Sequence, residues 1–230
     1  SNKKIALIGK NGVGKTTLIK KIINNNNNLL INSNLNIGYF SQNLSNLNEN
    51  NTIIENLVKD SIQNETTIRN ILGCLQIREN KIFDTIKNLS GGEKVKVAIS
   101  KLLISNTNFL ILDEPTNFLD IEAIEGLELL FKQYKGTILL ISHDKKFVDN
   151  ISDYTILFKD KKLIHFDGNY SKYLEYENNR KNNMMTSNDR IILEFRLTKL
   201  DTEISLEKDI NKKSILEKER NEILSKLANQ

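Results

Sequence analysis

The chain has 230 residues, of which 39% are hydrophobic and 27% are charged, and both values are ordinary for a globular domain in water. No apolar run approaches the roughly 20 residues that a membrane-spanning helix needs, so we expect no membrane insertion. Cys74 is the only cysteine, which excludes an internal disulfide and fits a reducing compartment, so we expect a cytoplasmic protein.

The net charge is +4, from 33 lysines and arginines against 29 acidic residues. The excess lies in the body of the chain, because residues 191–230 hold eight basic and eight acidic side chains. A small excess of this kind is typical of a solvated surface rather than of a nucleic-acid-binding stripe. We therefore expect RNA contacts to lie largely outside this chain.

The first predicted elements are a strand, a loop and a helix. The apolar run at residues 5–8 predicts a buried strand, a glycine-rich loop follows, and apolar spacing predicts a helix over residues 15–23. The asparagine run at residues 24–28 has low complexity and predicts a surface loop. Residues 36–42 predict a second strand that ends in a polar residue.

Residues 44–104 are predicted to be mostly helical. The segments TIIENLVKD and ETTIRNILGCLQI carry apolar residues at helical spacing, and an amphipathic helix is predicted after Gly92. The continuous apolar runs at 109–112 and 137–142 are typical of strands buried on both faces, and residues 120–134 between them predict a helix. YTILF and KKLIHF predict a final hairpin. This order predicts an α/β fold with a mostly parallel core sheet, antiparallel β strands and a helical subdomain.

The end of the chain predicts a C-terminal helical extension. Residues 177–190 are polar and indicate a boundary, and leucines and isoleucines recur beyond it at heptad or helical spacing. We predict two short helices in an antiparallel hairpin broken at residues 211–213, with disorder in isolation as the alternative. The predicted domains are a main domain over 1–178, with a core at 1–43 and 107–178 and a helical subdomain at 44–106, and a tail over 179–230.

The segment GKNGVGKT matches the pattern of a phosphate-binding P-loop, with a strand predicted before it and a helix after it. Glycines allow backbone N–H groups to turn inward around phosphate oxygens, and the helix N-terminus adds a positive dipole end. Lys15 is predicted to reach the β- and γ-phosphates of a nucleotide, and the Thr16 hydroxyl to reach Mg²⁺. The predicted phosphate-binding residues are Gly9, Asn11, Gly12, Gly14, Lys15, Thr16 and Thr17.

Four polar residues follow predicted strands on the side where the P-loop lies. A carboxylate at such a strand end can hold Mg²⁺ through water, and Asp113 suits that role. Glu114 then suits the general base that polarises an attacking water molecule. Gln42 and His143 are placed to reach the γ-phosphate or the Mg²⁺ shell, although either alone is more typical of an ordinary surface or capping residue.

Six motifs occur in a fixed order along residues 3–168. They are GKNGVGKTT, Gln42, LSGGE, FLILDEPTN, Asp120 and SHD. This ordered set resembles the nucleotide-binding cassette of the ABC ATPase superfamily. The resemblance implies an ATPase that binds ATP and Mg²⁺. It assigns four roles: Gln42 as the Q-loop glutamine, Glu114 as the catalytic glutamate, Asp120 as the D-loop aspartate and His143 as the switch histidine.

The LSGGE segment resembles the signature loop of these cassettes. The resemblance implies that Ser90, Gly91 and Gly92 are aimed at the γ-phosphate bound by a second cassette, in the same full-length polypeptide or in a second copy of this chain. The implied catalytic set is Glu114, His143 and Gln42, and the implied metal set is Thr16, Gln42 and Asp113.

Narrower features resemble the ABC-F branch of the superfamily. They are DEPTNFLD with Asn117, the short segment between Gln42 and Leu89, DGNYSKYLE, and the tail ILEFRLTKLDTEIS. Members of that branch are twin-cassette proteins that act on ribosomes, and some protect ribosomes from antibiotics. The resemblance implies the C-terminal half of such a protein. Phe118 departs from the histidine that is common in the branch.

The family stacks adenine on an aromatic residue upstream of the P-loop strand, in a segment that this sequence does not contain. We therefore expect weak ATP binding. Two other functions stay open: an ATPase subunit of a membrane transporter, which predicts a longer helical insert, and an interaction module whose hydrolysis is incidental. Glu114 and His143 favour a competent catalyst over the interaction module.

Overall fold

The computed structural model describes residues 2–24, 33–41, 44, 46–159, 162–207 and 209–228, with the backbone alone for 181–189, 210 and 228. Gln42 and residues 25–28 of the asparagine run lie outside the described residues. The chain divides into two compact units, Ser1–Tyr173 and Leu174–Gln230. The domain boundaries predicted from the sequence stay predictions.

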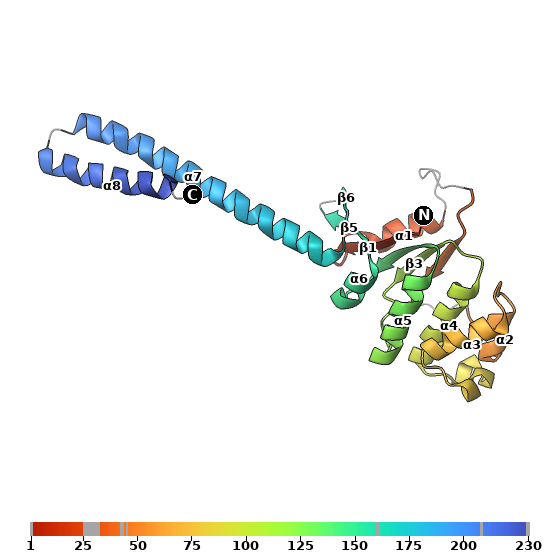
Figure 1. Ribbon diagram of the computed structural model, residues 1–230. Coiled ribbons are helices and arrows are strands. Elements are labelled where there is room, and N and C mark those ends of the chain that lie inside the picture. Colours follow the sequence, from red (N-terminus) through yellow and green to blue (C-terminus); the bar gives the residue numbers. More distant parts are fainter. Residues whose placement is uncertain are drawn as a thin grey trace. The chain divides into compact units, whose positions relative to one another are not determined.

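Six strands form one sheet in the order β2-β3-β4-β1-β5-β6 (Figure 1). Their bounds are β1 Lys4–Gly9, β2 Ile37–Phe40, β3 Phe109–Asp113, β4 Thr137–Ile141, β5 Tyr154–Lys159 and β6 Lys162–Phe166. Neighbouring strands are parallel except for β5 and β6, which form an antiparallel hairpin. The mostly parallel α/β sheet and the final hairpin predicted from the sequence are thus confirmed.

Eight α-helices and two short 3₁₀ helices accompany the sheet in the described part of the chain. Their bounds are α1 Lys15–Ile23, α2 Ile53–Val58, α3 Glu65–Cys74, η1 Glu79–Phe83, η2 Ile86–Asn88, α4 Gly91–Ile104, α5 Ile121–Gln133, α6 Lys145–Ile151, α7 Tyr170–Leu206 and α8 Ile210–Ala228. The start of α5 shows why the sequence sets these bounds, because the Asp120 side chain accepts the Ala123 N–H at 2.8 Å.

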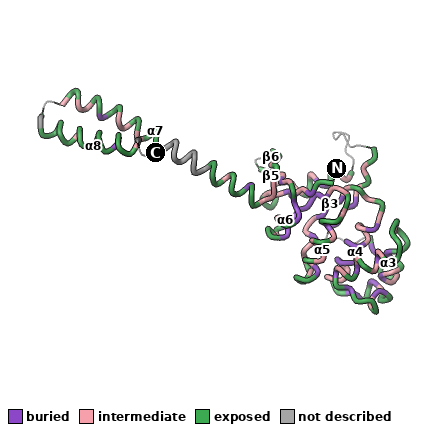
Figure 2. Tube along the Cα trace, in the orientation of Figure 1, coloured by how far each residue is buried: buried purple, intermediate pink, exposed green. Residues whose placement is uncertain are grey.

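The two faces of the sheet are covered by different helices. On one face, Ile19 of α1 packs with Leu7 and Ile111 of the strands. On the other, Ile99 of α4 and Phe131 of α5 belong to the larger core. Figure 2 shows these buried segments through the sheet and the helices packed on it. The central strands β3 and β4 are buried on both faces, as their continuous apolar runs predict, whereas β6 is exposed.

The region between β2 and β3 is helical, as predicted. Thr52 begins α2 with a capping box, in which its side chain accepts the Glu55 N–H and the Glu55 carboxylate accepts the Thr52 N–H. Asn64 caps α3 through its side chain, which accepts the Thr67 N–H at 2.9 Å. The region packs on α4, whose Val95, Ala98 and Ile99 are buried as the amphipathic pattern predicts.

The unit Leu174–Gln230 contains the greater part of α7 and all of α8, which run antiparallel (Figure 1). Leu200 and Ile223 are its buried residues among the described side chains. Arg196 of α7 and Glu219 of α8 form an ion pair at 2.9 Å. The predicted pair of antiparallel helices is confirmed.

The predicted tail is wrong in two details, the length of its first helix and the position of the break between its helices. The helix α7 is 37 residues long and runs through the polar residues 177–190 without interruption. The break lies between Leu206 and Ile210 rather than at residues 211–213, which are inside α8. The physical reason is Asp209, whose side chain accepts the Asn211 N–H at 2.9 Å and so begins α8.

Candidate active site

The first glycine-rich loop joins the carboxyl end of β1 to the start of α1. Gly12 and Gly14 have φ angles of 76° and 109°, which side chains other than glycine rarely adopt. Gly14 is also the N-cap residue of α1, so no side chain caps this helix. The first turn of α1 is therefore left open to an external acceptor, which is the arrangement that binds anions.

Lys15 lies at the start of α1 and turns back over the loop. Its Nζ donates to the carbonyl oxygen of Gly9 at 2.7 Å and to that of Lys10 at 3.2 Å. These bonds place a positive charge beside the backbone N–H groups of the loop. The loop and the lysine together form a cationic cradle, as the P-loop pattern predicts.

Asp113 ends β3, which neighbours β4, and β4 neighbours β1. The carboxyl ends of parallel strands meet at one edge of the sheet, so Asp113 faces the region of the loop. Burial raises the pKa of the Asp113 carboxyl, while the charges of Lys15 and His143 oppose the rise. A half-buried carboxylate whose charge is disfavoured by burial gains free energy from a cation placed beside it.

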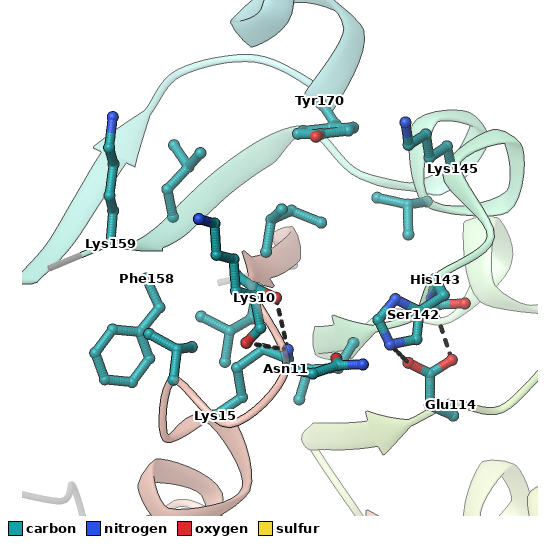
Figure 3. Close-up of a pocket in the computed structure, with 17 residues that line it drawn as sticks. Lys10, Asn11, Lys15, Glu114, Ser142, His143, Lys145, Phe158, Lys159 and Tyr170 are labelled. Carbon is teal, nitrogen blue, oxygen red and sulfur yellow. Dashed lines mark hydrogen bonds and ion pairs between the residues drawn. The ribbon is translucent and has the colours of Figure 1, made fainter. Parts of the chain in front are cut away.

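Glu114 follows Asp113 with an unusual backbone. Its φ of 53° lies in the left-handed region, and its N–H donates to the Ile141 carbonyl at 2.8 Å. One carboxylate oxygen accepts the His143 N–H at 3.1 Å, and the other lies 3.5 Å from His143 Nε2 (Figure 3). A strained backbone held by several bonds is typical of functional positions.

The turn that carries His143 is fixed by a residue to which the sequence analysis gave no role. The Ser142 hydroxyl accepts the Asp144 N–H at 3.1 Å and lies 3.3 Å from the Thr116 hydroxyl. It therefore ties the turn after β4 to the segment after Glu114. The serine of SHD, directly before the strand-end histidine, was the available sequence signal.

Most of the predicted site residues share one cavity of about 330 Å³. It is lined by Asn11, Gly12, Gly14, Lys15, Thr16, Thr17, Asp113, Glu114, Ile141 and His143. A neighbouring cavity of about 620 Å³ adds Gly9, Lys10, Lys145 and Tyr170, and Figure 3 shows its labelled side chains around the loop. The structure thus brings the first loop, both carboxylates and the histidine together. Gln42 lies outside the described residues.

The second glycine loop does not line either cavity. Ser90, Gly91, Gly92 and Asp120 are therefore not brought to the P-loop of the same chain. Ser90 begins α4 with a capping box, in which its hydroxyl accepts the Glu93 N–H at 3.3 Å and its own N–H donates to a Glu93 carboxylate oxygen at 2.9 Å. The Lys81 ammonium pairs with the same carboxylate.

The donor set of the first cavity fits a magnesium ion that arrives with a phosphate group. Thr16 and Asp113 offer hard oxygen donors beside Lys15, and Mg²⁺ is usually held by one or two protein oxygens together with substrate phosphates. No group of three or more His, Cys, Asp or Glu side chains that could hold a metal occurs in the described part of the chain. The oxygen donors of Thr16 and Asp113 beside Lys15 fit a metal that is bound together with a nucleotide.

A glycine loop after a parallel strand, a lysine folded over it and a carboxylate on a neighbouring strand end define a P-loop nucleotide-binding domain. A protein-family model described as ABC transporter matches residues 1–117. The chain belongs to this family and is an ATP-binding cassette, as the ordered motifs predict.

Three relatives show how much of the chain is shared. The probable ATP-binding protein YbiT of Escherichia coli is 37% identical over 178 residues, which are 74% of this chain and 34% of YbiT. The ATP-binding protein Uup of Haemophilus influenzae is 38% identical over 74% of this chain and 27% of Uup. ABC transporter F family member 2 of Arabidopsis thaliana is 35% identical over 75% of this chain and 26% of the relative. The chain spans about a third or less of these relatives.

Solved structures agree on the fold. The archaeal ribosome recycling factor aABCE1, in complex with the ribosomal stalk protein aP1, is 26% identical with a TM-score of 0.59, over 68% of this chain and 32% of that one. A dimeric ATP-binding cassette bound to ADP and Pi is 20% identical with a TM-score of 0.56, over 72% of this chain and 85% of that one. In the part of the chain that the structure describes, we find no helix both long and apolar enough to cross a membrane.

Proposed function

We propose that this chain is an ATP-hydrolysing cassette, the C-terminal half of a twin-cassette ABC-F protein, and that it acts in the cytoplasm on the ribosome. The observation that carries the hydrolytic activity is the placement of Glu114. Its carboxylate is fixed against His143 in the same cavity as Lys15 and Asp113. The proposal gives each of these residues a separate task.

The P-loop and Lys15 bind and orient the phosphates, because the loop offers backbone N–H groups and Lys15 a mobile positive charge. Thr16, Asp113 and Gln42 are assigned to hold Mg²⁺, which neutralises phosphate charge when it is bound. Glu114 accepts the proton of the attacking water, and His143 keeps the Glu114 carboxylate in position.

A second cassette completes the proposed site. Ser90, Gly91 and Gly92 lie outside the cavities that hold this chain's own P-loop, so a role at a phosphate requires a partner. The partner is assigned as the other cassette of the full-length protein, or as a second copy of this chain when it is alone. Asp120 bonds to Lys96 of α4, the helix that begins at the signature loop, and is assigned to the same interface.

The ribosomal role is supported by likeness. The relatives include a protein named as an F family member, and the archaeal recycling factor was solved with a ribosomal stalk protein. The role is either in translation or in the protection of ribosomes from antibiotics. The alternative of a transporter ATPase gains no support from these relatives.

The test of hydrolysis is Glu114→Gln, compared with Glu122→Gln on the exposed first turn of α5. Removal of the general base should lower kcat by at least about 100-fold and leave MgATP affinity within about twofold. Glu122→Gln should turn over ATP like the parent chain. Normal turnover by Glu114→Gln would overturn the assignment of this carboxylate.

A further inference from the structure

A buried lysine joins the signature helix to the segment that follows Glu114. Lys96 lies in α4, and only 6% of its surface is exposed. Its Nζ donates to an Asp120 carboxylate oxygen at 2.9 Å. The bond to Lys96 is the largest of the effects that lower the pKa of the Asp120 carboxyl. A long cationic side chain is costly to bury, so its ion pair with Asp120 indicates a specific role.

Asp120 ends the short segment 114–120, which is held by backbone hydrogen bonds within it. The Asn117 N–H donates to the Glu114 carbonyl at 3.3 Å, and the Leu119 N–H donates to the Thr116 carbonyl at 3.2 Å. These two turns overlap at Thr116 and Asn117 and together span residues 114–119. A displacement at Asp120 is therefore carried to the backbone of Glu114.

The signature helix touches the same segment at a second point. A Cβ on Gly92 would lie 2.5 Å from the Phe118 carbonyl oxygen, so the two backbones are packed without space between them. Phe118 also has a left-handed φ of 67°. The segment is thus held by α4 at Phe118 and Asp120 and by the sheet at Glu114, where the N–H bonds to Ile141.

We propose that Lys96 is a positioning residue for the hydrolysis of ATP: through Asp120 and the 114–120 segment it holds the Glu114 carboxylate in register with His143. Lys96 lines neither of the two cavities at the P-loop. It links the loop assigned to a partner's nucleotide with the carboxylate assigned to this chain's own nucleotide. The inference rests on the proposed ATPase function.

Lys96 is buried whereas Asp120 is exposed, and this difference decides which of the two residues should be changed. The Asp120 side chain is 60% exposed, so loss of Lys96 leaves a solvated carboxylate that still caps α5. The opposite change, Asp120→Asn, leaves a buried ammonium without its counter-ion and should destabilise the fold more. Lys96→Met keeps the length and apolar stem of the side chain and is the variant of choice.

A matched control exists in the same helix. Lys101 of α4 is partly buried, with 17% of its side chain exposed. It pairs with Asp60 at 2.9 Å and donates to the Asn46 carbonyl at 2.9 Å, and neither partner belongs to the 114–120 segment. Lys101→Met therefore removes a comparable lysine–aspartate pair without touching Asp120. Both methionine variants should unfold at similar temperatures, so a purely structural effect would be common to both.

The kinetic test compares kcat and KM of the full chain. Lys96→Met should lose on the order of 10- to 100-fold in kcat with KM for MgATP within about twofold, because a small misplacement of a catalytic group has effects of that size. Lys96→Arg should recover most of the rate, and Lys101→Met should keep it. Equal rates for Lys96→Met and Lys101→Met would overturn the positioning role.

A second readout does not depend on turnover. The chain has only two histidines, and His143 lies 3.5 Å from Glu114 whereas His165 lies 3.6 Å from Asp167. In proton NMR spectra, Lys96→Met should shift the ring signals of His143 and leave those of His165 in place. Lys101→Met should shift neither.

The two readouts separate the two proposals. A parent chain that does not hydrolyse ATP would defeat the proposed function, and the His143 signals would still test the link from Lys96. An active parent chain whose His143 signals and kcat are unchanged in Lys96→Met would defeat the link alone.

Discussion

The helices α1 and α4 both begin at glycine-rich segments, but the N–H groups of their first turns are bonded in different ways. At α1 the N-cap is Gly14, which offers no side chain, and the neighbouring Lys15 folds back over the loop. At α4 the N-cap is Ser90, which forms a complete capping box with Glu93. One loop is left open for a ligand, and the other is closed by its own side chains.

Under the proposed function, this difference allows the two loops to take separate parts at one nucleotide. The open loop shares a cavity with Asp113 and Glu114, while the capped loop lies outside it. A capped first turn is stable alone and presents a surface of fixed shape. We therefore interpret the first loop as the binding site of this chain and the second as a contact surface offered to another cassette.

The largest expected effect comes from an experiment that separates the loops onto two chains. Lys15→Met should disable the open loop, and Gly91→Asp should place a charge on the capped one, where a side chain meets nothing within 4 Å. Each variant alone should lose at least about 100-fold in ATP turnover. A mixture should regain part of the parent rate, because a mixed pair contains one intact composite site. A mixture no faster than the two variants measured apart would break the interpretation.

An intermediate effect should distinguish the two glycines of the capped loop. A Cβ on Gly92 would lie 2.5 Å from the Phe118 carbonyl, whereas one on Gly91 meets nothing within 4 Å. Gly92→Ala should lower the free energy of unfolding by about 1–3 kcal/mol. Gly91→Ala should leave it unchanged or raise it by up to about 1 kcal/mol. Urea titration measures both, and equal effects would contradict the tight packing on Phe118.

The smallest expected effect concerns Glu93, whose carboxylate completes the capping box at the start of α4. The bond from Lys81, followed by the bond from the Ser90 N–H, lowers the pKa of the Glu93 carboxyl to about 2. A lowered pKa contributes stability above the ordinary value of 4.5, and that stability is lost as the pH falls from 4.5 towards about 2. Glu93→Gln should therefore destabilise the chain by about 1 kcal/mol at neutral pH, with a smaller difference in acid.

The capping box of α2 provides the control for this pH dependence. Glu55 bonds to Thr52 in the same geometry, and the described residues show no ion pair to it. Glu55→Gln should therefore show a weaker dependence on pH than Glu93→Gln. Equal dependence in the two variants would mean that Lys81 contributes nothing to the closed loop.

Much of the site could be predicted from the sequence because its residues stand at strand ends. Continuous apolar runs located β1, β3 and β4, and the carboxyl ends of neighbouring parallel strands must meet, so Asp113 and Glu114 had to lie near the P-loop. The link from Lys96 was not predicted. A lysine between Val95 and Val97 is usually solvated, and only packing shows that it is buried against Asp120.

The tail shows the other limit of sequence patterns. Apolar spacing predicted two helices, but it did not locate the break between them, because residues 211–213 have no strong preference against a helix. The position is decided by the side chain of Asp209, which bonds to the first turn of α8. A single capping residue therefore outweighed the register of the apolar repeat.

The place of β1 in the sheet has a consequence for how the chain is made. Its two neighbours are β4 and β5, in which Ile138 pairs with Lys4 and Tyr154 pairs with Ile5. During synthesis β1 has neither of these two partners until β4, Thr137–Ile141, has been added. Such distant pairing slows folding and leaves apolar strands exposed in the meantime. Nucleotide can therefore stabilise the nascent chain only late, after β4 and His143 have left the ribosome that made it.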